Sequence, residues 1–236
     1  MSPRQQVNNA DIALYKCDLS SLTSVRDCAE EIKSKEARVD VLINNAGVLG
    51  VPYSKTEDGL ETVIGTNHFG HFLLTNLLLD KLKESAPSRI VNVSSSGHKW
   101  GRLDLEDINW ERRKYSEWDA YYQSKQANNL FTVELARRLQ GTGVTTYALH
   151  PGVVITDIWR NFEGPMKYFL YFLALLLMKN CKDGAQTTIE CAVAPSLASE
   201  SGKYYADCVE EAPAPHATDK EMAKKLWELS EKMVGM

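Results

Sequence analysis

Residues 39–47 read VDVLINNAG, a short apolar run that ends in two asparagines, an alanine and a glycine. Such a run is long enough for a buried strand and too short for a helix of ordinary length. Similar runs, rich in apolar or β-branched residues, recur along the chain. We predict five strands, at Ile12–Lys16, Val39–Ile43, Arg89–Val93, Val144–Leu149 and Gly202–Tyr205.

Helical patterns separate these runs. They lie at Ser21–Ala37, Glu57–Glu84, Asp119–Gln140 and Asp219–Met233. Alternating strands and helices predict an α/β fold with a Rossmann-like, doubly wound parallel sheet that is covered on both faces. The chain has 236 residues, 44% of them hydrophobic, and no Pro/Gly/Ser-rich linker divides it. We therefore expect a single domain over residues 1–236.

Composition excludes several classes of protein. The formal net charge is -4 and no large basic cluster occurs, so we expect no nucleic-acid partner. The number of cysteines, 5, is odd and none form a CxxC pair, which indicates reduced thiols in an intracellular protein. The apolar stretch at residues 168–178 is too short to span a bilayer, which takes about 20 residues. It could be a core helix or a surface helix that touches lipid.

Polar or glycine-containing turns follow three of the predicted strands. Asn44-Asn45-Ala46-Gly47 follows the second run, Ser94-Ser95-Ser96 the third, and Pro151-Gly152 the fourth. The carboxyl ends of parallel strands lie at one edge of a sheet, where ligands of such folds bind. These turns therefore predict a single site at that edge.

Tyr121 and Lys125 are four residues apart near the start of a predicted helix, so they share one face. A phenol has an ordinary pKa of about 10, and a nearby ammonium favours the phenolate. We expect Lys125 to lower the pKa of Tyr121 so that Tyr121 can exchange a proton with a substrate oxygen. A lone pair of this spacing could equally be a surface tyrosine beside a solvated lysine.

His68 and His71 are three residues apart in a predicted helix and could bind a metal together. A zinc site needs further ligands, and none are evident. We favour packing near the site for both histidines and expect no metal.

Several motifs together resemble the short-chain dehydrogenase/reductase family. They are Asn44-Asn45-Ala46-Gly47, Asn67-His68-Phe69-Gly70, Val93-Ser94-Ser95, Tyr121-Tyr122-Gln123-Ser124-Lys125 and Pro151-Gly152, in that order and spacing. The amino-acid sequence at residues 131–139, 150–154 and 212–215 is similar to that of the retinol dehydrogenase branch. The resemblance runs from about Asp18 to the C-terminus.

The resemblance implies a role for each matching residue. Tyr121 corresponds to the catalytic acid/base, and Lys125 to the lysine that lowers its pKa and holds the nicotinamide ribose. Ser95 corresponds to the serine that binds the substrate oxygen, with Ser94 and Ser96 close enough to be alternatives. Asn67 corresponds to the asparagine whose backbone holds a water of the proton relay. Cofactor contacts are implied for Asp18, Asn44, Ala46, Gly47, Tyr121, Lys125, Pro151, Gly152 and Thr156.

The branch implies an NAD(P)-dependent oxidoreductase that interconverts a small lipophilic, retinoid-like alcohol and its carbonyl form. NADP is the cofactor implied, and NAD stays open. Residues 159–178 are rich in aromatic and apolar side chains, which suggests a lid over a lipophilic substrate and peripheral contact with a membrane. We expect an intracellular protein, cytoplasmic or peripheral on an endoplasmic reticulum or mitochondrial membrane. The sequence leaves open whether the chain forms a homo-oligomer.

The sequence departs from the family in one respect: no G-x-x-x-G-x-G turn occurs. Since the first predicted strand matches the family's third, we expect the domain to lack the first two strands and this phosphate-binding turn. A chain of this kind would bind the cofactor poorly. Two alternatives to an active dehydrogenase therefore stay open, namely an inactive truncated isoform that binds or interferes with a partner, and an epimerase.

Overall fold

The structure, a computed structural model, describes residues 11–154, 156, 158 and 179–236. Within these residues no helix is both long enough and apolar enough to cross a membrane. The predicted lid and membrane contact at 159–178 lie outside the described residues.

In the described part of the chain, five strands lie side by side in one sheet, in the same order as in the sequence. The first four are parallel, which confirms the predicted α/β architecture, whereas the fifth runs antiparallel to the fourth. Asp207 and Cys208, both with positive φ, make the tight turn before that fifth strand. The strands are β1 (Val41–Asn44), β2 (Ser88–Val93), β3 (Val144–His150), β4 (Lys203–Ala206) and β5 (Val209–Glu210).

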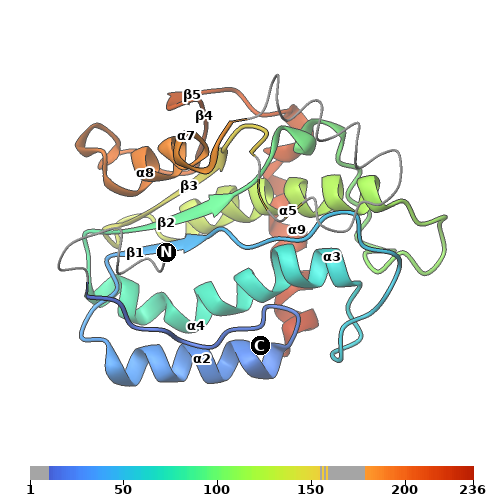
Figure 1. The fold of residues 1–236 in the computed structure, drawn as a ribbon, viewed down its shortest axis with the longest axis horizontal. Helices are drawn as coiled ribbons and strands as arrows, with labels where there is room; N and C mark the ends of the chain where they lie inside the picture. The colour runs from blue at the N-terminus through green and yellow to red at the C-terminus, as the bar shows by residue number, and fades with distance from the viewer. Residues whose placement is uncertain (1–10, 155, 157, 159–178) are drawn as a thin grey trace.

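The strand predicted at Ile12–Lys16 is wrong. Residues 11–18 form no ladder, and the side chain of Leu14 is 91% exposed. A strand exists only where another strand accepts its backbone hydrogen bonds. Among the described residues, this segment pairs with no strand, and it runs as an extended segment toward α2 (Leu22–Lys35) (Figure 1).

Helices cover both faces of the sheet, as predicted (Figure 1). On one face α4 (Gly70–Glu84) and α5 (Glu117–Arg138) contact β1, β2 and β3, with α2 packed on α4 and α9 (Lys220–Val234) packed on α5. On the other face, α7 (Cys181–Gly184) and α8 (Gln186–Val193) lie among the described residues, and the sequence patterns predicted neither of them. Short 3-10 turns complete the fold at η2 (Ser96–Trp100), η4 (Pro195–Leu197) and η5 (Pro215–Ala217).

The helix predicted at Glu57–Glu84 begins five residues later than expected. Gly59 has a φ of 78°, which interrupts a helix, and the buried Glu61 carboxylate caps the start by accepting from the amides of Val63 and Ile64. The helix then runs through α3 (Thr62–Ile64), a π-helical turn η1 (Gly65–Phe69) and α4. A π-helical turn inside a helix often marks a functional site.

The core forms on both faces of β2, since its successive side chains point in opposite directions. Ile90 packs into the cluster of α4, α5 and α9, while Val91 and Val93 pack against α8 and β3. Between β1 and β2 the core is polar: the buried Asn44 amide donates to Asn92 Oδ1 at 2.8 Å and to Thr75 Oγ1 at 2.9 Å.

Candidate active site

The turns that follow β1, β2 and β3 meet the start of α5 at the carboxyl edge of the sheet. α5 begins where Ser116 accepts from the Asp119 amide as an N-cap. Tyr121 and Lys125 therefore lie in its first two turns, and their side chains are 9% and 3% exposed. The Lys125 ammonium donates to the carbonyl of Val93, the last residue of β2, at 2.9 Å. The expected pairing is present, with Lys125 Nζ 5.5 Å from the Tyr121 ring centroid.

Of the three serines after β2, Ser95 is the one beside the tyrosine. Its side chain hydrogen-bonds the Tyr121 hydroxyl, and its Oγ accepts from the Gly97 amide at 3.0 Å. Ser94 points elsewhere, because its hydroxyl donates to the carbonyl of Lys125 at 2.9 Å.

Burial dominates the protonation of both catalytic candidates. It raises the pKa of Tyr121 to about 12, although the Ser95 hydrogen bond opposes the rise. Burial also lowers the pKa of Lys125 to about 8. The expectation that Lys125 brings the Tyr121 pKa below its ordinary value is therefore wrong for the protein alone. Burial removes the water that would stabilise the phenolate form of Tyr121. The hydrogen bond from Ser95 restores only part of that stabilisation.

Asn67 lies in the π-helical turn, and its side chain fixes the turn after β1. Its Oδ1 accepts from the Val48 amide at 2.8 Å, and its Nδ2 donates to the Val48 carbonyl and to Ser124 Oγ, both at 3.0 Å. The Asn67 carbonyl accepts from His71 Nδ1 at 3.1 Å. A carbonyl oxygen can accept two hydrogen bonds, and the His71 ring supplies one of them.

Gly47 brings backbone close to this group. A Cβ built on Gly47 would lie 3.2 Å from Asn67 Oδ1 and 3.7 Å from Lys125 Nζ. The lack of a side chain leaves room in front of the ammonium. Gly152, after β3, has a φ of 87°, a conformation that favours glycine.

The two histidines of η1 and α4 are packing residues. His68 Nε2 hydrogen-bonds Ser230 Oγ at 2.9 Å, and both rings are buried. In the described part of the chain, no three His, Cys, Asp or Glu side chains gather as metal ligands.

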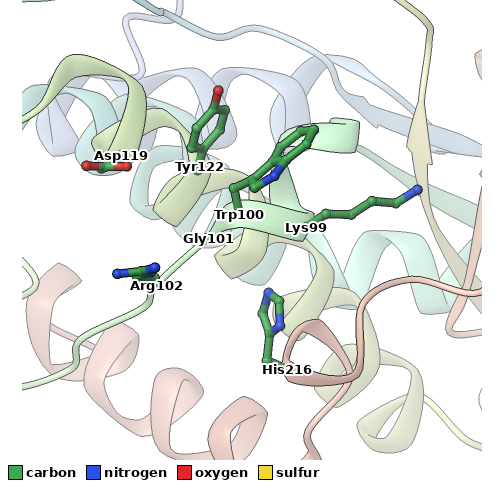
Figure 2. A pocket seen from close by; sticks show the side chains of 7 residues that line it. All are labelled: Lys99, Trp100, Gly101, Arg102, Asp119, Tyr122 and His216. Carbon is green, nitrogen blue, oxygen red and sulfur yellow. The ribbon is translucent and has the colours of Figure 1, made fainter.

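A cavity of about 620 Å³ is lined by Lys99, Trp100, Gly101, Arg102, Asp119, Tyr122 and His216 (Figure 2). Tyr122 belongs to this lining, whereas Ser95, Tyr121 and Lys125 do not. The guanidinium of Arg102 and the carboxylate of Asp119 lie on the same side of it in Figure 2, so the lining presents no single charge.

Residues 2–166 match the family described as short chain dehydrogenase, which is more than half of the chain. The chain belongs to the short-chain dehydrogenase family. Human retinol dehydrogenase 13 is 50% identical over 237 residues, which cover 99% of this chain and 72% of that protein. Retinol dehydrogenase 14 of Mus musculus is 49% identical over 97% of this chain and 69% of that protein. Human retinol dehydrogenase 12 is 47% identical over 99% of this chain and 73% of that protein.

Solved structures agree with this assignment. An uncharacterized protein from Mycobacterium paratuberculosis has a TM-score of 0.73 at 38% identity, covering 93% of this chain and 74% of that one. The NADP complex of RhlG from Pseudomonas aeruginosa shares the fold, with a TM-score of 0.61 at 22% identity, covering 85% and 75%. The NADPH-bound carbonyl reductase from chicken fatty liver also shares the fold, with a TM-score of 0.59 at 20% identity. That match covers 85% of this chain and 77% of the reductase. The chain is thus an oxidoreductase by family.

Other cofactor candidates of this short-chain dehydrogenase lie outside the hydrogen-bonded group around Tyr121. The exposed Asp18 accepts from the amide and hydroxyl of Ser20. The Asn44 side chain faces the core, so its contribution to a cofactor would come from its backbone. Ala46 is exposed, Pro151 is half-buried, and Thr156 is exposed and accepts from the Ile158 amide.

Sequence reasoning missed two members of the site, Ser124 and Gly97, which contact Asn67 and Ser95 directly. His71 lies beside Asn67, where the sequence analysis expected it to pack. Ser124 lies inside the Tyr121–Lys125 motif, and its neighbours could have drawn attention to it. Nothing in the pattern indicates Gly97, whose added Cβ would lie 2.7 Å from Tyr122 Cδ1.

Proposed function

We propose that this chain is an NADP-dependent oxidoreductase that interconverts a lipophilic alcohol and its aldehyde or ketone, with Tyr121 as the acid/base. One observation carries the proposal. Ser95, Tyr121 and Lys125 lie together at the carboxyl edge of the sheet, with the Tyr121 hydroxyl hydrogen-bonded to Ser95 and the Lys125 ammonium buried behind it.

The residues present fit the nicotinamide and ribose end of a dinucleotide. At Gly47 no side chain crowds the Lys125 ammonium. Of its three N–H groups, the described residues engage one, through Val93. The other two suit ribose hydroxyls. The NADP(H)-bound relatives of this fold favour NADP as the cofactor. When bound, the nicotinamide supplies or accepts the hydride at the reacting carbon.

The chain's own groups act on the oxygen. Ser95 Oγ accepts from the Gly97 amide, and its hydroxyl, which bonds Tyr121 in the protein alone, can donate to a substrate oxygen placed between the two side chains. Tyr121, with its raised pKa, keeps its proton at neutral pH and releases it only to an oxygen that gains negative charge. Lys125, whose pKa is about 8, can return a proton to the phenol. The Asn67 carbonyl can hold a water behind it.

Apolar residues beside Tyr121 support a lipophilic substrate. Tyr121 packs in a buried cluster with Leu49, Val63, Trp110 and Ala120. Tyr115, Trp118 and Ile158 are only partly buried and pack against this cluster. Aromatic and aliphatic side chains of this kind line sites that bind apolar ligands. The names of the relatives point to retinoids as the substrate class.

Oxidation of NADPH with all-trans-retinal, followed at saturating concentrations, tests the proposal. Tyr121→Phe keeps the ring and removes the proton carrier, so turnover should fall at least about 100-fold. Tyr122→Phe is the matched control, because this neighbour lacks a lysine four residues on and lies in the lining of the cavity of Figure 2. It should keep most of the activity. An inactive wild-type protein, or substantial turnover by Tyr121→Phe, would overturn the proposal.

Competing substrates test the substrate class separately. We expect a higher kcat/KM for a long apolar aldehyde than for a short polar one such as glyceraldehyde, since only the long chain has apolar surface to bury against the side chains around Tyr121. Equal kcat/KM values for the two would contradict a lipophilic site while leaving the assignment of Tyr121 intact.

A further inference from the structure

The ring of His98 joins the active-site serine to the C-terminal part of the chain. His98 is fully buried in η2, and its Nδ1 lies 2.6 Å from the carbonyl oxygen of Ser95. Its Nε2 lies 3.1 Å from the backbone nitrogen of Ala214. A carbonyl can only accept and an amide can only donate. The ring must therefore carry its hydrogen on Nδ1 and keep a bare Nε2.

A second set of bonds holds the same two segments together. His216 Nε2 donates to the carbonyl of His98 at 3.0 Å, and Gln126 of α5 donates to the carbonyl of His216 at 3.1 Å. Figure 2 shows His216 projecting from η5 toward the turn that carries Trp100 and Gly101. The turn after β2 is thus fixed from α5 and from η5.

Ser95 depends on this turn. Parallel strand pairing ends at Ser94, whose amide donates to the carbonyl of Leu149 at 2.7 Å. Past that point, the Ser95 carbonyl accepts twice from one residue, through the backbone amide of His98 at 3.1 Å and through its ring. Gly97, which lies between Ser95 and His98 in the sequence, donates its backbone amide to Ser95 Oγ and so fixes the position of that oxygen.

We propose that His98 is a positioning residue, whose Nδ1–H holds the Ser95 carbonyl so that the Ser95 hydroxyl stays aligned with Tyr121 and the substrate oxygen. The role rests on the proposed function, since it matters only if Ser95 polarises a substrate. Burial also lowers the pKa of His98, which keeps the ring in the neutral form that both bonds require.

Two substitutions separate positioning from simple stabilisation. His98→Asn keeps a side-chain donor near the position of Nδ1 but cannot reach Ala214. His98→Phe keeps the ring volume and loses both bonds. Both variants lose the link to Ala214, so both should unfold at lower urea concentration. With retinal and NADPH, we expect kcat of His98→Phe to fall at least tenfold with KM within about twofold. His98→Asn should recover kcat to within about threefold of the wild type.

Equal kcat losses in the two variants, with an active wild-type enzyme, would overturn the positioning role and leave the proposed function standing. An inactive wild-type protein would overturn both. The ring ¹⁵N shifts of His98 give a readout independent of activity, and should show a protonated Nδ1 with a bare Nε2. A hydrogen on Nε2 would refute the geometry on which the role depends.

Discussion

Replacing Lys125 by methionine is expected to stabilise the fold while removing the ammonium from the active site. Lys125 is 3% exposed, and no salt bridge within the described residues includes its ammonium. Its hydrogen bond goes to a neutral carbonyl, that of Val93. Burying a charge without a counter-charge is costly, and methionine fills a similar volume without one.

The magnitude follows from the pKa of Lys125, which burial lowers from 10.5 to about 8. A tenfold change in a proton-binding constant is worth about 1.4 kcal/mol, so charging Lys125 in the folded protein costs about 3 kcal/mol. Removing the donor to Val93 costs about 1 kcal/mol. Lys125→Met should therefore raise the free energy of unfolding by about 2 kcal/mol at pH 7.

The pH dependence has a definite sign. The unfolded chain keeps the Lys125 proton up to its ordinary pKa of 10.5, whereas the folded protein releases it near 8. Between these values the unfolded state binds more protons, so the wild-type protein gains stability as the pH rises. The advantage of Lys125→Met should be largely gone by about pH 10.

Urea unfolding of both proteins at pH 7 and pH 10 measures the difference. Lys224→Met is the matched control, since Lys224 is exposed on α9. Its effect should stay below about 0.5 kcal/mol at both pH values. A Lys125→Met variant that is less stable than the wild type at pH 7, or a difference that does not change with pH, would refute the reasoning. Turnover should be lost in Lys125→Met regardless of its stability.

Three further predictions concern the frame of the site. Asn92→Ala removes the acceptor of the buried Asn44 amide and leaves a cavity, so the free energy of unfolding should fall by about 3 kcal/mol in urea; a loss under about 1 kcal/mol would contradict the polar pairing. Gly97→Ala would place a Cβ 2.7 Å from Tyr122 Cδ1, so the unfolding midpoint and kcat should both drop, and an unchanged kcat would show that the turn adapts freely. Glu134→Gln loses a carboxylate whose pKa is held low by hydrogen bonds from two arginines; its stability deficit should shrink as the pH falls below about 4, and a constant deficit would argue against this account.

Much of the site could be predicted from the sequence because the parallel topology of the sheet determines where the turns after the strands lie. Once residues 39–43, 89–93 and 144–149 are assigned as parallel strands, the turns that follow them must share one edge. The four-residue spacing of Tyr121 and Lys125 then puts both side chains on one helix face, and the structure brings Ser95 to the same place.

The errors have a common physical origin, which is that a local pattern does not specify its partner. The Ile12–Lys16 run has the composition of a strand, but pairing decides whether it becomes one. The polarity of Asn44 suggests a turn, yet its amide finds Asn92 and Thr75 and stays in the interior of the sheet. The direction of the Tyr121 pKa shift depends on burial, which residue spacing cannot report.

The end of β2 organises the site through neutral carbonyls instead of through charge pairs. Lys125 donates to the carbonyl of Val93, Ser94 donates back to the carbonyl of Lys125, and His98 donates to the carbonyl of Ser95. A carboxylate partner would hold Lys125 more firmly, but it would also cancel its charge at the phenol. Bonds to carbonyls fix the same positions and leave the positive charge in place for Tyr121 and a ribose. The cost of an uncompensated buried ammonium is then a consequence of the chemistry that the site is proposed to perform, so Lys125→Met should trade activity for stability.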